Sequence, residues 1–179
     1  MELQNIKNPN DILEYMDNIR YGYIDIYGEE HVNTLKGLRR IYRVSSLEET
    51  IQRKIGACLE QTILMSYLLD RLNIPNKMFC TRIYEPDDFN DLDADEHTHC
   101  FVLYYLDDKV HHLEHPDGDY KGIHTYDTEE EAIYKTNKRY EDMVGGKSRQ
   151  ITQFTSVEPG ISFKEFNNYI NSLDEVKKH

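Results

Sequence analysis

Residues 56–75 read GACLEQTILMSYLLDRLNIP, and this stretch decides the expected fold. Its apolar residues follow the spacing of a helix that buries one face, namely Leu59, Ile63, Leu64, Tyr67, Leu68 and Leu72. The pattern predicts a helix that begins near Cys58 and ends at Asn73 and Pro75. A thiol at a helix start lies beside free amide N–H groups and the positive end of the helix dipole, which favour the thiolate. Cys58 is therefore a candidate nucleophile.

A second interpretation of Cys58 stays open, in which it is a small buried residue between helix and sheet. The chain has three cysteines, Cys58, Cys80 and Cys100, without a CxxC pair. This odd count disfavours a disulfide scaffold or a four-cysteine zinc site, so we expect free thiols in the reducing cytoplasm.

A histidine begins the most apolar strand that the sequence predicts. Residues 77–83 form the first expected strand, and residues 98–105 and 109–115 form an expected antiparallel hairpin. His99 stands at the entry of this hairpin, before Cys100, Phe101 and Val102. A nucleophilic cysteine needs a partner that takes its proton and later protonates the leaving group, and His99 is the candidate.

The length of the hairpin loop decides which residue faces His99. If residues 107–108 are the whole loop, Glu114 lies diagonal to His99 on the same face of the sheet. A loop of three residues would place His115 there instead. No glycine is present to ease the longer loop, so we favour Glu114 as the carboxylate that orients the imidazole.

The whole chain predicts one α+β domain, 1–179, in which the nucleophile helix packs on an antiparallel sheet. The catalytic core covers about 45–126, and a helix–strand–helix extension covers about 127–173. We expect 21–44 to be loop with short helical pieces.

The charge balance excludes one class of partner. The 21 Lys and Arg against 33 Asp and Glu give a net charge of −12, which argues against nucleic acid and favours a basic substrate or partner. No apolar run has the length of a membrane span, and Met1 to Asn10 lack a signal-peptide core. We therefore predict a cytoplasmic protein without a membrane partner, and the sequence does not predict its oligomeric state.

The sequence contains two candidate metal sites, and neither is favoured. Asp91, Asp93 and Asp95 have the spacing of a calcium loop, but Glu96 replaces its glycine and Val102 its bidentate glutamate. A zinc site would use the histidines and cysteine of the hairpin region: His97, His99, Cys100, His111, His112 and His115. Neighbouring residues of a strand point to opposite faces, so four of these ligands do not converge. We predict no metal and no cofactor.

Taken together, these motifs resemble the transglutaminase-like superfamily of papain-related cysteine enzymes, and most closely its small bacterial members of unassigned activity. The resemblance covers roughly residues 10–126. It rests on Gly56-Ala57-Cys58 before a helix that ends at Asn73-Ile74-Pro75, on His99-Cys100-Phe101-Val102, and on a carboxylate before Pro116. Similar patterns are Tyr21 to Asp25, Glu60 with Gln61, and Tyr120 to His124.

The resemblance implies a Cys-His-Glu triad that forms an acyl-thioester. Cys58 would be the nucleophile, His99 the general acid and base, and Glu114 the orienting group, with the Cys58 N–H binding the oxyanion. Two departures stand out: many members have Trp after the histidine and Asp as the third residue, whereas this chain has no Trp and carries Glu114.

We predict a cysteine-dependent hydrolase of peptide or protein amides, of protease or deamidase type. Hydrolysis needs only water at the thioester, whereas crosslinking also needs an amine site that excludes water. The alternatives are a transglutaminase that transfers the acyl group of glutamine, and a non-catalytic binding module on the same fold.

Overall fold

The computed structural model describes residues 1–83, 98–143, 145 and 149–176. The helices are α1 (Pro9–Met16), α2 (Leu38–Ile41), α3 (Leu47–Arg53), α4 (Cys58–Arg71), α5 (Glu129–Met143) and α6 (Phe163–Ser172), with 3-10 turns at Leu3–Asn5 and Gly118–Tyr120. The strands are β1 (Arg20–Ile24), β2 (Glu30–Val32), β3 (Ile55–Gly56), β4 (Asn76–Ile83), β5 (His99–Leu106), β6 (Lys109–Glu114), β7 (Gly122–Tyr126) and β8 (Arg149–Phe154).

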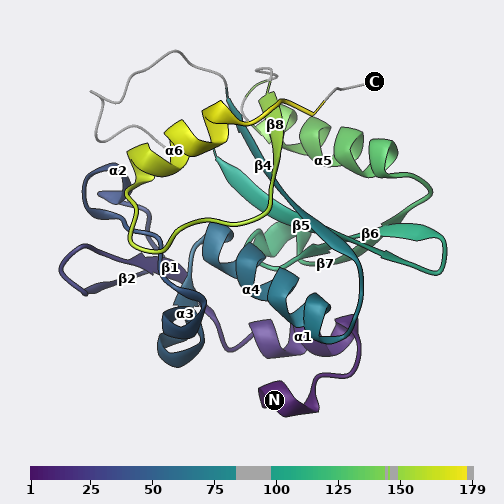
Figure 1. Cartoon of the computed structure of the whole chain (residues 1–179), viewed down its shortest axis with the longest axis horizontal. Coiled ribbons are helices and arrows are strands. Elements are labelled where there is room, and N and C mark those ends of the chain that lie inside the picture. Colours follow the sequence, from purple (N-terminus) through teal and green to yellow (C-terminus); the bar gives the residue numbers. More distant parts are fainter. Residues whose placement is uncertain (84–97, 144, 146–148, 177–179) are drawn as a thin grey trace.

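Two sheets organise these elements (Figure 1). The larger sheet has the order β7-β6-β5-β4-β8, and every neighbouring pair in it is antiparallel. The smaller one has the order β2-β1-β3. The fold is α+β, as predicted. The late strand β8 pairs with β4, so the C-terminal part of the chain contributes directly to the main sheet.

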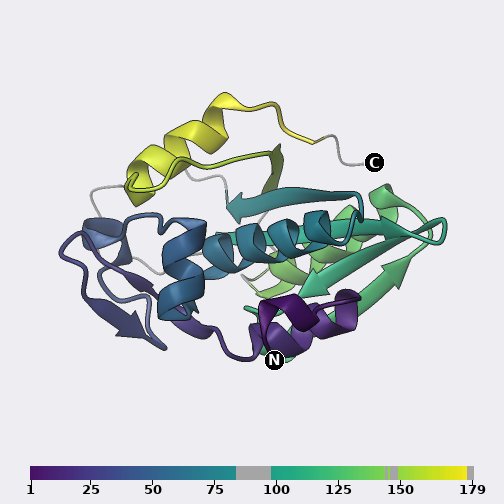
Figure 2. The ribbon, with the colours of Figure 1, turned by 60° about the horizontal axis from the view of Figure 1, so that its bottom comes forward.

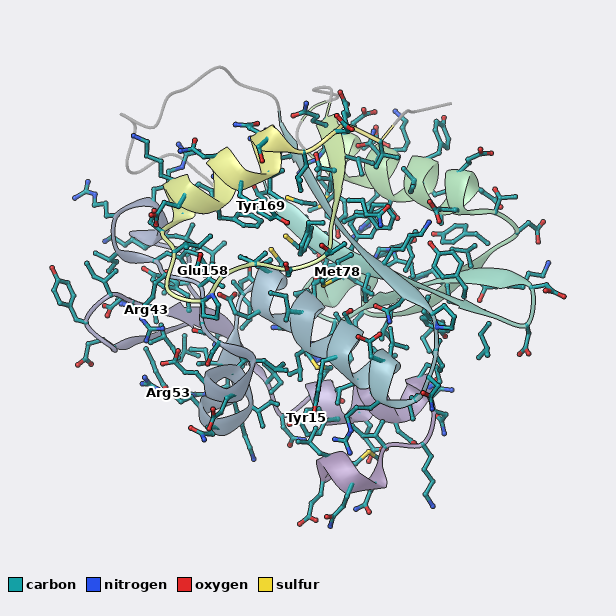
Figure 3. All side chains as sticks on the ribbon, viewed as in Figure 1. Tyr15, Arg43, Arg53, Met78, Glu158 and Tyr169 are labelled. Carbon is teal, nitrogen blue, oxygen red and sulfur yellow. The ribbon has the colours of Figure 1, made fainter. Side chains whose placement is uncertain are left out.

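The main sheet is covered on both faces, and Figure 2 shows α4 lying along one of them. Side chains of a strand alternate between faces. On β5, Cys100 and Val102 belong to the apolar core shared with α1 and α4, whereas Phe101 packs with Ala132 of α5. Figure 3 labels two members of the first core, Tyr15 on α1 and Met78 on β4.

The β5–β6 hairpin has the two-residue loop that the sequence predicts. Asp107 and Asp108 have φ angles of 54° and 57°, the left-handed pair of a type I′ turn. Leu106 therefore pairs with Lys109, and Val102 with Leu113. This register brings Glu114 to the face of the sheet that carries His99.

The prediction for 21–44 was wrong about the strands, because this part contains β1 and β2, whereas the short helix α2 is a helical piece of the kind expected there. Gly22 explains why the strand pairing was missed. Its φ is 154°, and a Cβ there would lie 2.0 Å from the backbone oxygen of His31. The glycine that reads as a breaker in the sequence thus permits close approach of two strands.

The structure bears only partly on the metal-site and membrane expectations. The calcium-like loop at 85–96, and His97 of the zinc alternative, lie outside the described residues. Of the helices in the described part of the chain, none is both long and apolar enough to cross a membrane.

Candidate active site

Cys58 is the first residue of α4, and only Ala57 separates it from the short strand β3. The approach to this helix is tight, because a Cβ on Gly56 would lie 2.8 Å from the Cβ of Glu60. Glu60 caps the helix from inside: its Oε2 accepts the backbone N–H of Ala57 at 3.2 Å. Gly56, two residues before the thiol, and Glu60, two residues after it, thus pack against each other at the helix start.

Glu60 is almost fully buried, with 2% of its surface exposed. Its Oε1 accepts the hydroxyl of Tyr42 at 2.5 Å and the backbone N–H of Ser45 at 3.3 Å. Burial raises the pKa of Glu60 to about 7, because its hydrogen bonds only partly replace the lost water. This buried polar group anchors the start of α4 to the segment that contains Tyr42.

The sulfur of Cys58 lies half-buried where the helix start meets β5. In the thiol form its S–H reaches the carbonyl oxygen of Thr98 at 3.9 Å. The side chains of Cys100 and His99 lie close enough to this sulfur to stabilise its thiolate form. The Cys100 hydrogen bond, with a smaller share from His99, outweighs burial and holds the pKa of Cys58 well below that of an ordinary thiol.

His99 connects the sulfur to a carboxylate. Its Nε2 lies 3.0 Å from Oε2 of Glu114, which leaves Nδ1 as the ring nitrogen for Cys58. Burial alone would lower the pKa of His99, but the Glu114 carboxylate and Cys58 together raise it to about 10. A low thiol pKa beside a high imidazole pKa favours a thiolate–imidazolium pair at neutral pH.

Glu114 is 1% exposed and accepts three hydrogen bonds. Its Oε2 contacts both His99 and His112, the latter at 2.8 Å, and its Oε1 accepts the backbone N–H of Asp117 at 3.0 Å. Burial would raise the pKa of Glu114, but the charge of His99 and these donors hold it far below the ordinary value. The carboxylate is therefore charged at neutral pH.

His112 is a residue whose role the sequence did not predict. It is completely buried, and burial lowers its pKa, so the ring is neutral. A carboxylate can only accept, so Nε2 of His112 carries the proton donated to Glu114. Nδ1 then accepts the hydroxyl of Thr136 at 3.2 Å. Helix α5 thereby fixes the tautomer that supports Glu114.

His115 has a different place from the one that a longer loop would give it. Its Nδ1 lies 2.6 Å from Oε1 of Gln61, and its Nε2 lies 3.2 Å from Oδ1 of Asp17. Glu114, not His115, is the residue in contact with His99.

Helix α5 closes the side of the site away from α4. The ring of Tyr140 lies 4.4 Å from that of His99, centre to centre, and its hydroxyl donates to Asp117 at 3.0 Å. Arg139 binds the same carboxylate at 2.9 Å. The sequence alone could not predict the contact between Tyr140 and His99, because the pattern of an acidic helix does not indicate which element its buried face packs against.

The structure thus brings the three predicted site residues together: Cys58 contacts His99, and His99 contacts Glu114. Their catalytic roles remain predictions. Within the described ranges, no group of three or more His, Cys, Asp or Glu side chains could hold a metal ion. The arrangement can supply a thiolate, a proton donor beside it, and a charge that keeps the donor protonated.

Comparison with known proteins shows the family of the chain through one sequence model. The sequence model of a family described as "Transglutaminase-like domain" matches residues 2–112. A solved structure from Parabacteroides distasonis, named a "putative protease", is 16% identical, with a TM-score of 0.44. That match covers 88% of this chain, and the chain spans only 25% of the other protein. No curated protein matches the sequence.

Proposed function

Because the chain belongs to the transglutaminase-like domain family, we propose that it is a cysteine-dependent amide hydrolase with Cys58, His99 and Glu114 as its catalytic triad. The observation that carries the proposal is the 3.0 Å contact between His99 Nε2 and Glu114 Oε2, on a histidine that also contacts the Cys58 sulfur. This series of three groups is the one that thiol acyl transfer requires.

In the first half of the proposed reaction, the Cys58 thiolate attacks the amide carbonyl carbon. The backbone N–H of Cys58, free at the helix start, stabilises the oxyanion of the tetrahedral intermediate. The His99 imidazolium gives its Nδ1 proton to the departing amine or ammonia, and the C–N bond breaks. An acyl-thioester on Cys58 and a neutral His99 remain.

Water resolves the thioester in the second half. His99 takes one proton from the water, whose oxygen forms the new C–O bond as the C–S bond breaks. The products are a carboxylic acid and the restored thiolate–imidazolium pair. Glu114 keeps its charge throughout, so it lowers the cost of each state in which His99 is positive.

Hydrolysis is preferred to crosslinking because it needs no second site for an amine. A transglutaminase reaction would use the same thioester, and a binding module would use the same fold without it. We further propose that the substrate is a peptide or protein amide, and that the net charge of −12 favours a basic one. The free thiols suit a reducing compartment such as the cytoplasm.

Two measurements test this function. Iodoacetamide at pH 6 should alkylate Cys58 much faster than Cys80 or Cys100, as located by peptide mass mapping. A mixture of peptides incubated in H₂¹⁸O should then yield new carboxyl groups with one ¹⁸O atom, with wild-type and Cys80→Ser protein but not with Cys58→Ser.

The outcomes separate the alternatives. Incorporation of a fluorescent primary amine into the peptides, in place of ¹⁸O, would establish acyl transfer and overturn hydrolysis. Slow, equal labelling of all three thiols, without turnover, would overturn the enzyme and favour the binding module.

A further inference from the structure

An apolar pocket opens beside the Cys58 sulfur. It measures about 40 Å³, and Cys58 itself, Leu35, Leu38, Leu59, Phe163 and Phe166 are among the residues that line it. Apart from Cys58 itself, none of the described residues that line it carries a charge. The Tyr42 hydroxyl is already bound to Glu60, and the two other polar lining residues, Tyr21 and Thr98, also have partners. A group attached to the carbonyl carbon that Cys58 attacks would therefore meet mainly hydrocarbon.

One wall of this pocket comes from α6. Phe163 and Phe166 lie on this helix, far beyond residues 2–112 that match the family. The wall is consequently a property of this chain rather than of the matched region. It can set the preference of this chain without any change in the three catalytic side chains.

The α6 wall is held firmly against the helix start that carries Cys58. The ring of Phe163 packs edge-on against Tyr42 at 6.5 Å between centres, and Tyr42 donates to Glu60 of α4. Phe166 packs edge-on against Phe154 of β8 at 6.4 Å. A backbone bond from the Val44 N–H to the carbonyl of Ile161 ties the entry of α6 to the segment after α2. The pocket is thus built by fixed elements and is largely pre-formed.

We propose that this pocket binds a short aliphatic side chain on the acyl portion of the substrate, an inference that rests on the function proposed above. Burial of each methylene in such a pocket is worth about a fourfold gain in binding, from ~0.8 kcal/mol per methylene. A charged group would lose its water without gaining a partner. An aromatic ring is too large, since a cavity that holds benzene measures ~150 Å³.

The test uses the full chain and a series of alkyl methanethiosulfonates, which need no knowledge of the substrate. The Cys58 thiolate attacks the sulfenyl sulfur, forms a mixed disulfide and releases methanesulfinate. Methyl, ethyl, propyl, butyl and benzyl reagents are compared with cationic and anionic ethyl reagents at pH 6. Each rate constant is divided by that for N-acetylcysteine, which removes the intrinsic reactivity of the reagent.

We expect the normalised rate to rise about threefold to fourfold per methylene from methyl to propyl. It should then level off, and the benzyl and charged reagents should be slower than propyl. Leu35→Phe, which fills the pocket, should lower the propyl-to-methyl ratio at least fivefold. Leu106→Phe, at a leucine that is 39% exposed on the hairpin, is the matched control and should keep the wild-type ratio.

Phe166→Ala gives a second, opposite change. It enlarges the pocket, so the best reagent should shift from propyl toward butyl or benzyl, with retained folding checked by circular dichroism. A Cys58 that reacts fast with every reagent, without preference for chain length, would overturn the pocket assignment and leave the proposed enzyme intact. A Cys58 that reacts no faster than Cys80 with the methyl reagent would overturn the proposed function itself.

Discussion

His112 Nε2 lies 2.8 Å from Oε2 of Glu114, at the oxygen that also contacts His99. Two imidazoles thus share one carboxylate oxygen, and their protonation differs. His99 has a raised pKa of about 10, whereas burial lowers the pKa of His112. His112 therefore acts as a neutral donor that holds the carboxylate in place for its charged neighbour.

Replacement of His112 should slow the alkylation of Cys58 without changing the direct contacts of the sulfur. His112→Ala removes a hydrogen bond to a charged group, worth roughly 1.5–3 kcal/mol, so alkylation of Cys58 at pH 6 should slow about tenfold. His112→Gln, whose amide N–H can reach Glu114, should restore much of the rate. His111→Ala, at the neighbouring position on the opposite face, is the control. A rate in His112→Ala equal to that control would exclude the supporting role.

Cys100 should determine part of the reactivity of Cys58. Its hydrogen bond is the largest cause of the low pKa of Cys58. Cys100→Ala should therefore move the midpoint of the pH–rate profile for Cys58 alkylation upward, toward the ordinary thiol pKa near 8.5. Cys80→Ala, at the residue paired with Cys100 on β4, removes no direct partner of Cys58 and should shift it less. Equal midpoints in both variants would contradict this role.

Gly56 should tolerate no side chain, because a Cβ there would lie 2.8 Å from Glu60 Cβ. Gly56→Ala forces the start of α4 to move, at a cost of about 1–3 kcal/mol in the free energy of unfolding. For a chain of this size that corresponds to a fall in Tm of about 2–4 °C per kcal/mol. Gly118→Ala, where a Cβ would meet nothing within 4 Å, is the matched control. An unchanged Tm in Gly56→Ala would refute the close approach.

Glu60 should make the stability of the protein fall with rising pH. Its folded pKa of about 7 lies above the unfolded value near 4.3, so the folded state binds the extra proton between them. This contribution is full below pH 4 and is lost as the pH rises through 7. Urea unfolding at pH 5 and 8 should show the loss, on the order of 3 kcal/mol for such a shift, reduced in Glu60→Gln. The same pH dependence in both proteins would contradict the assignment.

The sequence predicted the parts of the fold that depend on local pattern. The helix from Cys58 and the hairpin with a loop at Asp107 and Asp108 follow from apolar spacing and turn chemistry, and the hairpin register placed Glu114 rather than His115 beside His99. The prediction failed at β1, because Gly22 pairs closely with another strand and reads locally as a breaker.

The supporting residues could not be predicted because their contacts are distant in sequence. His112 meets Thr136 of α5, and Tyr42 meets Glu60 of α4. Nothing near His112 or Tyr42 in the sequence marks such a partner. Buried polar groups of this kind are recognised only once the packing shows where each hydrogen bond ends.

The central claim is that His99, charged beside Glu114, acts together with Cys100 to keep Cys58 as a thiolate. Its most direct test is the rate of Cys58 alkylation by iodoacetamide between pH 4 and 10, measured by mass spectrometry in wild type, His99→Ala and Glu114→Gln. The thiolate is present above the pKa of Cys58, so the wild-type rate should reach its plateau well below the ordinary thiol pKa of about 8.5. In both variants the midpoint of the pH–rate profile should rise toward that value. A wild-type midpoint near that value, unchanged by either substitution, would contradict the account.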